Sequence, residues 1–458
     1  MSASESTIAA LATPPGVGGV AVVRISGAEA YEIAGRVFRP KDERKSLAAA
    51  KGYSALLGYF VEDGAVCDEV IALCFRAPHS YTGEDVVELS CHGGLAVSGR
   101  LLRALFAAGA VPAGRGEFTK RAFLSGRISL TQAEAVMEMV NASSRQGMQA
   151  AAAVMDGALY RKIESVRGSL VALAGHIAAA ADFPEEDVPE LSDAALCAAL
   201  SGACGVLNAL LDGYDRGAVL RRGVETVIVG SPNVGKSTLL NLLAGFERAI
   251  VTPVAGTTRD IVEQEVQLAG VRLRLADTAG LHDTDNLVEA EGIRRARQRL
   301  DRAALILAVF DASRPLGEED ILLARQCEGR PAVALLNKSD LPQVTGEDAL
   351  QPYFGAVAAI SARDETFLPT VERAVAQVLR LHELDPDACL LANERQRAAA
   401  QRARDALREA MSAAQGGVTV DAVGVCVDDA LGALYELTGE NASDAVIDEV
   451  FSSFCVGK

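Results

Sequence analysis

Residues 226–237 read TVIVGSPNVGKS, an apolar run that leads into a glycine-rich loop and then into a helical pattern. The spacing GxxxxGKS between a strand and a helix is that of a phosphate-binding P-loop. Glycine lets the backbone wrap closely around phosphates, and the helix N-terminus attracts the anion. Lys236 would place its charge on the β and γ phosphates, and the Ser237 hydroxyl would bind Mg²⁺. The loop residues expected to contact nucleotide are Asn233, Val234, Gly235, Lys236, Ser237 and Thr238.

Two further segments predict the remaining contacts to the phosphates and to Mg²⁺. In DTAG (277–280), which ends a predicted strand, Asp277 would hold Mg²⁺ through water and the Gly280 amide would meet the γ-phosphate. Between the P-loop and DTAG lies GTTRD (256–260), which includes Thr257. There Thr258 is the expected second protein ligand of Mg²⁺ when the γ-phosphate is present.

The segment NKSD (337–340) predicts which base is bound. It follows the apolar run Val333–Leu336. Asp340 would accept hydrogen bonds from the N1 and N2 donors of guanine, whereas adenine offers neither, and an unpaired carboxylate would be costly. Asn337 and Lys338 belong to the same element, and Ser361 and Ala362 would close the base pocket from the next strand end. Four elements in this order predict a guanine-nucleotide site.

The residue that orients the attacking water is not decided by these motifs. The position after DTAG is Leu281, which cannot orient water as the glutamine of Ras-like enzymes does. Candidates for that role are His282, Asp283, Asp285, Glu289 and Glu291. Asn233 is either a turn residue or the ligand of a monovalent cation that would take the place of an arginine finger.

Outward from the P-loop, the composition changes twice. Residues 1–120 mix short β-rich runs with one helical pattern and predict an α+β domain. Residues 121–218 and 385–458 are rich in helix formers, and 219–384 alternate apolar strands with helices. The predicted fold class is therefore an α+β N-terminal domain, an α-helical domain and an inserted α/β P-loop G domain of the Ras-like type.

Charge and cysteine usage limit the functional classes. The net charge of −17 makes the chain a poor general binder of nucleic acid. The arginines at 395, 397, 402, 404 and 408 are either a local basic patch for nucleic acid or a solvated helix face, and the second interpretation is favoured. Nine scattered cysteines with no CxxC pair predict neither disulfides nor zinc and favour a reducing, cytoplasmic location. We expect no signal peptide and no membrane-spanning segment.

With these motifs, the chain closely resembles the MnmE/TrmE family of tRNA-modification GTPases. The resemblance covers nearly the whole chain and includes motifs that ordinary G domains lack. The matching stretches are ATPPGVGGVAVVRISG (12–27), YTGEDVVELSCHGG (81–94), RGEFTKRAF (115–123), LTQAEAV (130–136), GSPNVGKSTLLN (230–241), VAGTTRDIVEQ (254–264), DTAGLHDT (277–284) and FSSFCVGK (451–458).

The resemblance implies roles for particular residues. Glu289 matches the position that orients the water, and Cys455 matches a near-terminal cysteine. A thiol beside a one-carbon folate would act in group transfer, and the alternative is a structural cysteine. Residues 1–120 match a tetrahydrofolate-binding and dimerisation domain. Position 127 is usually lysine in the family and is arginine here, so the charge is kept and the geometry differs. The implied potassium ligands are Asn233, Thr252, Val254 and Thr257, and the implied folate contacts are Arg24, Glu88, Arg127 and Lys458.

The resemblance also implies a reaction and partners. The chain would be a homodimeric, potassium-activated GTPase that uses GTP, Mg²⁺, K⁺ and a 5-formyl or methylene tetrahydrofolate. With a flavin-dependent protein of the MnmG/GidA family, in a heterotetrameric or larger complex, it would add a carboxymethylaminomethyl or aminomethyl group to C5 of the wobble uridine of certain tRNAs. The rival interpretation is a regulatory or ribosome-assembly GTPase without base chemistry. A stand-alone folate-dependent aminomethyltransferase is disfavoured by the complete G domain.

Overall fold

A computed structural model describes most of the chain. The described residues are 6–142, 145–182, 192–217, 223–245, 264–275, 303–381, 390–416 and 418–458. The chain divides into two compact units, and we describe each by itself. The first unit is Met1–Met137, Tyr160–Leu200 and Asp405–Lys458, and the second is Glu138–Leu159 and Ser201–Arg404. The boundaries expected at residues 120, 218 and 384 stay a prediction.

The first unit contains a seven-stranded sheet of order β3-β4-β5-β6-β2-β1-β7. Neighbouring strands are antiparallel except for β1 and β7, which are parallel. The strands are β1 (Ile8–Leu11), β2 (Val20–Ser26), β3 (Phe38–Pro40), β4 (Ser54–Glu62), β5 (Ala65–Phe75), β6 (Val86–His92) and β7 (Val111–Pro112).

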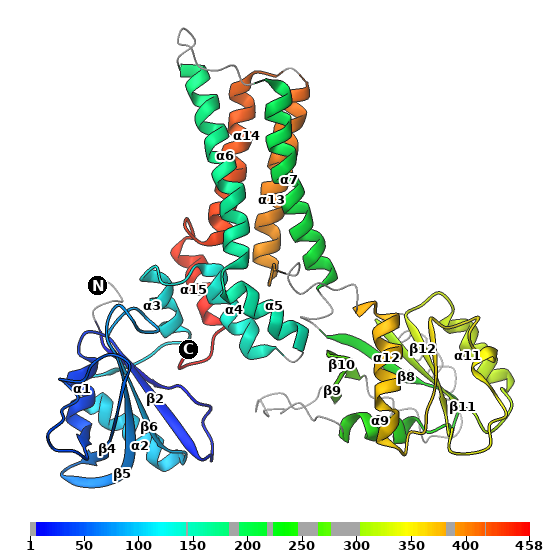
Figure 1. Ribbon diagram of the computed structural model, residues 1–458, viewed down its shortest axis with the longest axis horizontal. Helices are drawn as coiled ribbons and strands as arrows, with labels where there is room; N and C mark the ends of the chain where they lie inside the picture. Colours follow the sequence, from blue (N-terminus) through cyan, green and yellow to red (C-terminus); the bar gives the residue numbers. More distant parts are fainter. Residues whose placement is uncertain are drawn as a thin grey trace, which may run out of the picture. The chain divides into compact units, whose positions relative to one another are not determined.

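Helices α1 (Ala30–Val37) and α2 (Leu95–Ala107) contribute to the core on one face of this sheet (Figure 1). In β2, Val23 and Ile25 are buried in that core, whereas Arg24 between them is partly exposed. This alternation is typical of an antiparallel sheet with one packed face. It leaves Arg24 on the opposite face, where a ligand can reach it.

The other helices that precede or follow the inserted α/β segment bring together parts of the chain that are distant in sequence. They are α3 (Glu117–Leu124), α4 (Leu130–Asn141), α5 (Arg145–Met155), α6 (Ala158–Asp182), α7 (Asp193–Arg216), α13 (Glu394–Gln415), α14 (Val420–Thr438) and α15 (Asp444–Ser452). Leu130 and Val136 of α4 share one apolar cluster with Phe451 of α15 and Phe454 after it. The last helix of the chain therefore packs on the first helix of the predicted helical domain.

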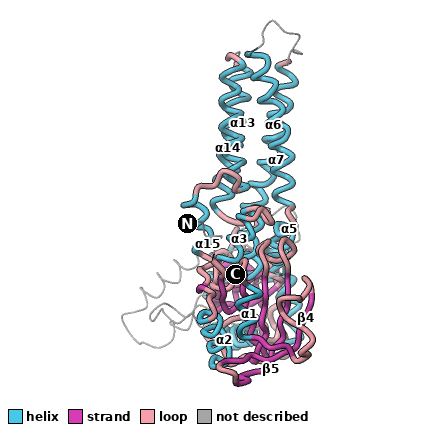
Figure 2. Tube along the Cα trace, turned by 90° about the vertical axis from the view of Figure 1, so that its left-hand side faces the viewer, coloured by secondary structure: helices cyan, strands magenta, loops and turns pink. Residues whose placement is uncertain are grey.

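Of the four long helices, α6 and α7 precede the α/β segment in the sequence, and α13 and α14 follow it (Figures 1 and 2). In the first unit, Arg167 of α6 pairs with Glu440 beyond α14 and lies 4.7 Å from the ring centroid of Tyr435. In the second unit, the hydroxyl of Tyr214 on α7 donates to Glu394 of α13 at 3.1 Å. The two helical stretches thus pack together, and the α/β segment is an insertion between them. The expected fold class is confirmed.

The inserted segment forms a six-stranded sheet of order β13-β12-β11-β8-β10-β9, parallel except for β9 and β10. Every residue of β11 and β12 is buried, as expected for central strands covered on both faces. The strands are β8 (Val224–Val229), β9 (Gln264–Leu268), β10 (Val271–Leu275), β11 (Leu305–Asp311), β12 (Ala332–Asn337) and β13 (Ala356–Ala359). The helices are α9 (Lys236–Gly245), α11 (Glu318–Cys327) and α12 (Leu368–Val378), with 3-10 turns η2 (Glu347–Ala349) and η3 (Glu365–Phe367).

The strand order of this sheet reverses at β8. The next strands in sequence, β9 and β10, lie on one side of β8, while β11 lies on the other. In open α/β sheets, ligands bind at the carboxyl ends of the strands where the strand order switches. Here that point is the end of β8 and β11, where the P-loop begins.

Helix α7 is more apolar than we expected for any helix of this chain. Ala194–Asp215 in α7 is long and apolar enough to cross a membrane by length and composition, whereas we expected no such segment. The helix buries Leu200, Leu207 and Leu210, as a helix packed in a bundle does. A packed core helix passes the same test, so one such helix is weak evidence for a membrane span.

Candidate functional site

The P-loop joins β8 to α9 with a backbone that requires glycine at two positions. Gly230 has φ +154° and Gly235 has φ +103°. A Cβ atom on Gly230 would collide with the carbonyl oxygen of Val309 in β11, and one on Gly235 with the side-chain nitrogen of Asn337. Asn233, also at positive φ (+62°), is exposed. The loop is therefore pressed against two strand ends and leaves its outer side open.

Lys236 begins α9 and lies across the loop. Its Nζ donates to the carbonyl oxygens of Gly230 at 2.8 Å and Ser231 at 2.9 Å. Burial lowers the pKa of the Lys236 ammonium, because desolvation disfavours its charge. Ser237 and Thr238 are exposed in the first turn of this ten-residue helix. A positive charge, hydroxyls and a helix N-terminus at one place suit an anionic phosphate.

The NKSD segment, which is predicted to read the base, is tied to the P-loop by Asn337, which is 4% exposed. Its side-chain amide donates to the carbonyl oxygen of Val234 at 2.7 Å, and its Oδ1 accepts from the backbone N–H of Ala362 at 2.9 Å. Ser361 and Ala362 are buried at the end of β13, and Asp340 is exposed. The structure thus brings together the predicted P-loop, NKSD and Ser361–Ala362 elements at one edge of the sheet.

Lys338 is held by a carboxylate that the sequence interpretation missed. It has φ +66°, and its Nζ lies 2.6 Å from Oδ2 of Asp311 at the end of β11. Burial would raise the pKa of Asp311, but hydrogen bonds from Lys338 and Ser313 outweigh it and hold that pKa below its usual range. The position of Asp311 at the end of a fully apolar strand was the signal that could have identified it.

Several predicted residues lie outside the described part of the chain. They are Thr252, Val254, Thr257, Thr258, Asp277, Gly280 and Glu289. Their assignments as ligands of Mg²⁺ and K⁺, as nucleotide contacts and as the water-orienting group stay predictions.

A second candidate site lies on the N-terminal sheet. Arg24 of β2 and Glu88 of β6 are directly opposite each other in the register, and Arg24 Nε donates to Glu88 Oε1 at 2.7 Å. The guanidinium lies 5.0 Å from the ring centroid of Tyr81 and 5.5 Å from that of Phe118. Both charged side chains keep 17% exposure. An ion pair bordered by two aromatic rings suits a flat, polar heterocycle.

The C-terminal tail runs beside this site. The carbonyl oxygen of Lys458 accepts from the backbone N–H of Phe118 at 3.2 Å, and that of Cys455 accepts from Gly116 at 3.3 Å. Cys455 is exposed. The tail therefore brings Lys458 to the residue whose ring lies under Arg24. Arg127 is exposed just after α3, and its backbone N–H donates to the carbonyl oxygen of Ala122 at 3.0 Å.

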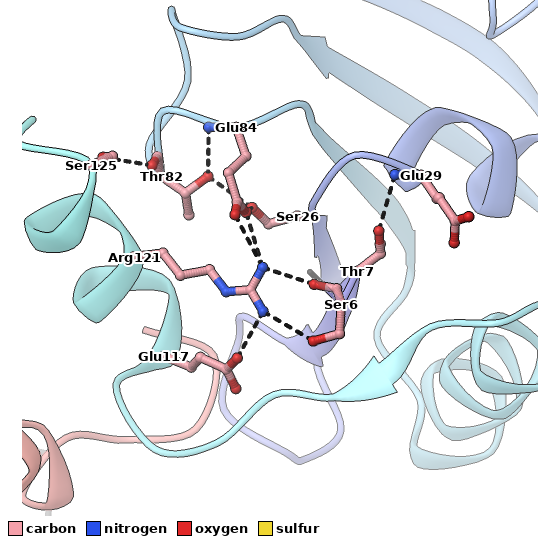
Figure 3. Close-up of polar contacts among 9 residues, drawn as sticks. All are labelled: Ser6, Thr7, Ser26, Glu29, Thr82, Glu84, Glu117, Arg121 and Ser125. Atoms are coloured by element: carbon pink, nitrogen blue, oxygen red, sulfur yellow. Dashed lines mark hydrogen bonds and ion pairs between the residues drawn. The ribbon is translucent and has the colours of Figure 1, made fainter. Parts of the chain in front are cut away.

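A buried arginine that the sequence interpretation missed holds α3 in place (Figure 3). Arg121 is 5% exposed and donates to the Ser6 carbonyl oxygen at 2.9 Å, to Glu84 at 3.1 Å and to Glu117 at 2.9 Å. Glu84 also accepts from Ser26 Oγ of β2 at 2.6 Å. The network ties α3, which carries Phe118, to the sheet. A cavity of about 170 Å³ adjoins it, lined by Thr82, Glu84, Glu117, Lys120, Arg121, Leu124 and Ser125.

The parallel sheet, the P-loop after β8 and the NKSD segment after β12 define the class of protein: a P-loop GTPase with a Ras-like G domain. Two family models extend this class to the whole chain. The model "MnmE helical domain" matches residues 130–455, and "GTP-binding protein TrmE N-terminus" matches residues 7–127. The chain belongs to the MnmE family of tRNA modification GTPases, so the expected membership is confirmed.

Individual relatives agree with this assignment. The tRNA modification GTPase MnmE of Symbiobacterium thermophilum is 42% identical over 99% of this chain and 100% of its own length. The tRNA modification GTPase MnmE of Chloroflexus aurantiacus is 41% identical over 99% of this chain and 100% of its own length. A solved structure of Era in complex with MgGDPNP and 16S ribosomal RNA nucleotides is 26% identical over 33% of this chain and 56% of its own, with a TM-score of 0.25, which is too low to add to the argument.

Proposed function

We propose that this chain is a potassium-activated GTPase that modifies C5 of the wobble uridine of certain tRNAs together with a flavin-dependent MnmG/GidA-family protein. The group added is carboxymethylaminomethyl or aminomethyl. The observation that carries the proposal is the presence, in one chain, of a guanine-nucleotide site and an arginine–glutamate site bordered by the C-terminal tail. The full-length relatives named as tRNA modification GTPases support it.

At the nucleotide site, the chain's own groups suit magnesium only when phosphate is present. The described residues hold no cluster of three or more His, Cys, Asp or Glu that could bind a metal alone. Ser237 would supply a hydroxyl at the N-terminus of α9, with Thr258 as the second protein ligand and phosphate oxygens beside them. Mg²⁺ binds in this way in P-loop enzymes, with few protein ligands and several from phosphate and water.

Hydrolysis would depend on Glu289 and on a potassium site. Glu289 would orient the attacking water, because Leu281 cannot. Asn233 is exposed on the outer side of the P-loop, where its side-chain oxygen is free to bind a cation together with Thr252, Val254 and Thr257. Potassium there would place positive charge where negative charge develops in the transition state.

At the N-terminal site, Arg24, Glu88, Arg127 and Lys458 would hold a tetrahydrofolate derivative in its 5-formyl or methylene form. The side chains fit, since Glu88 can accept from the donor edge of a pterin and Tyr81 and Phe118 offer rings to pack on it. The folate would supply the one-carbon unit. Cys455, exposed in the adjoining tail, would act in the transfer of that unit.

The assembly would be a cytoplasmic homodimer bound to its flavin-dependent partner. With a net charge of −17, this chain offers little general attraction for tRNA, so the partner would supply much of the basic surface. The rival, a ribosome-assembly GTPase, would use the same G domain but would have no need of the Arg24–Glu88 site or of the FCVGK tail.

Mass spectrometry of bulk tRNA nucleosides tests the proposal. In a strain that lacks this chain, the 5-aminomethyl-type uridines should disappear and return with the wild type but not with Glu289→Ala or Cys455→Ser. If the uridines never disappear, the tRNA assignment is wrong. If Cys455→Ser restores them, the cysteine is structural.

GTP turnover in potassium and in sodium tests the cation site separately. Turnover should be roughly tenfold or more faster in potassium, because removing a transition-state charge partner commonly lowers rates by at least that factor. Equal rates in the two salts would exclude Asn233 as a cation ligand.

A further inference from the structure

A buried carboxylate from another helix reaches the P-loop. Asp320, in the first turn of α11, is 2% exposed. Its Oδ1 accepts from Ser231 Oγ at 2.6 Å, and its Oδ2 accepts from the Gly317 backbone N–H at 3.0 Å and lies 3.2 Å from Arg314 Nη2. A buried carboxylate is costly unless donors surround it, and here a hydroxyl, a helix N-terminus and a guanidinium do so. The carboxylate is thus held rigidly against the loop.

Ser231, the second residue of the P-loop, is held on two sides. Its hydroxyl donates to Asp320, and its carbonyl oxygen accepts from Lys236 Nζ at 2.9 Å. Any shift of Ser231 therefore moves one of the two oxygens that hold the Lys236 ammonium. Asp320 and Lys236 each bond to Ser231, so Asp320 would act on Lys236 through Ser231.

The loop needs such external support because its backbone is unusual. Asn233 is a non-glycine residue at φ +62°, a conformation that persists only where its surroundings determine it. Gly230 and Gly235 add backbone freedom to the same loop. Asn337 holds the second half of the loop through Val234. Asp320 holds the first half through Ser231. The P-loop is thus fastened at both ends by side chains from other elements.

We propose that Asp320 is a positioning residue for phosphate binding: it fixes Ser231 and, through it, the carbonyl oxygen that orients Lys236. Arg314 extends the link, since its Nε lies 4.0 Å from the Asp311 carboxylate that holds Lys338 of the base-reading segment. Loss of the Ser231–Asp320 bond speeds the release of GDP and GTP. The inference rests on the GTPase class of the site and not on the tRNA reaction.

The test measures the release of fluorescent mant-GDP from the full-length protein by stopped flow. Ser231→Ala removes the bond but leaves the contacts of Asp320 with α11 intact, and Asp320→Asn removes the charge. Each should release mant-GDP roughly tenfold faster, the effect expected for one hydrogen bond to a charged group. The double variant should be no faster than the faster single variant, because both changes act through the same Ser231–Asp320 contact.

Two matched variants separate this role from a purely structural one. Ser231→Thr keeps the hydroxyl and should release mant-GDP at the wild-type rate. Glu318→Gln removes an exposed charge from the same first turn of α11 and should also leave the rate unchanged. If Ser231→Ala releases mant-GDP like the wild type, or if Glu318→Gln is as fast as Asp320→Asn, Asp320 only stabilises the end of α11 and the proposal is wrong.

Discussion

At the residue scale, the nucleotide site depends on a few positions whose backbone or charge allows no alternative. Gly235 has φ +103°, and a Cβ atom added there would collide with the side-chain amide of Asn337. Asp340, by contrast, is exposed at its strand end and free to meet a base. Steric space therefore restricts which residue can stand at position 235, and hydrogen bonding to the base would restrict it at position 340.

Gly235→Ala should weaken GDP binding by roughly 10- to 100-fold. The added Cβ must move Asn337 or the loop, and strain of this kind amounts to about 1–3 kcal/mol. Titration with mant-GDP measures the effect. Gly346→Ala is the control, because that glycine has φ −93° and no atom within 4 Å of a Cβ. Wild-type affinity in Gly235→Ala would show that the loop adapts.

Asp340→Asn should exchange guanine for xanthine as the preferred base. The amide can donate to the C2 carbonyl of xanthine, whereas it leaves the N1 and N2 donors of guanine poorly matched. We expect GDP affinity to fall at least about 100-fold and xanthosine diphosphate to bind more tightly than GDP. Competition against mant-GDP measures both. An unchanged preference would remove Asp340 from the base site.

At the element scale, strand ends are cross-linked by side chains. Asp311 ends β11 and pairs with Lys338 after β12, while Asn337 at the end of β12 joins the P-loop to β13. Parallel strands bring their carboxyl ends to one edge, so polar residues there meet although they are distant in sequence. These links stabilise the same edge that would receive the nucleotide.

Asp311→Asn should lower stability at neutral pH and much less at acid pH. The pKa of Asp311 is lowered in the folded state, so its contribution is present above the ordinary carboxyl pKa of about 4 and is lost as the pH falls through the folded value. We expect a loss of roughly 1–3 kcal/mol at pH 7. Thermal unfolding midpoints of wild type and variant at pH 7 and pH 3 measure the trend.

The exposed Asp348→Asn serves as the control for this pH series. Its unfolding midpoint should follow the wild type at both values of pH. A difference between Asp311→Asn and wild type that is equal at pH 7 and pH 3 would show that the carboxylate charge is not what stabilises the strand ends.

At the scale of the whole molecule, the G domain is inserted between α7 and α13. The ends of those helices meet: Tyr214 donates to Glu394 at 3.1 Å, and Arg397 lies 3.6 Å from Asp215. An insertion with neighbouring ends disturbs its host little, because the host helices still pack when it is absent. The C-terminal tail adds a second long-range link, since it closes on the Gly116–Phe118 segment at the start of α3.

Replacing residues 218–389 with a flexible linker of about ten Gly/Ser residues, which spans roughly 17 Å, should leave a folded protein. Circular dichroism should show a cooperative thermal transition with helical content retained. A second variant that also removes residues 390–404 deletes the α13 turns beside α7 and should lose that transition. If both variants unfold alike, the host helices need the G domain.

The sequence by itself determined the nucleotide class, the order of the domains and the family. These rest on short contiguous motifs, and such motifs encode local requirements: a glycine at positive φ, a strand followed by a loop, a carboxylate placed for guanine. The mixture of short strands and helix expected within residues 1–120 is present, with β2, β6 and α2 among its elements, because their apolar patterns are strong. The stretch within residues 121–218 that was predicted to be helical contains the separate helices α4, α5, α6 and α7, with Gly157 at φ +84° before α6.

Only the tertiary structure decided which distant side chains meet. Ser231 and Asp320 lie 89 positions apart, Arg121 and Glu84 lie 37 apart, and Tyr214 and Glu394 lie 180 apart. Apart from Tyr214, these residues are of types that usually stay on the surface, and nothing adjacent in the chain marks them as paired. Pairing is a property of the folded arrangement, because burial makes each polar group require a partner that the local sequence does not name.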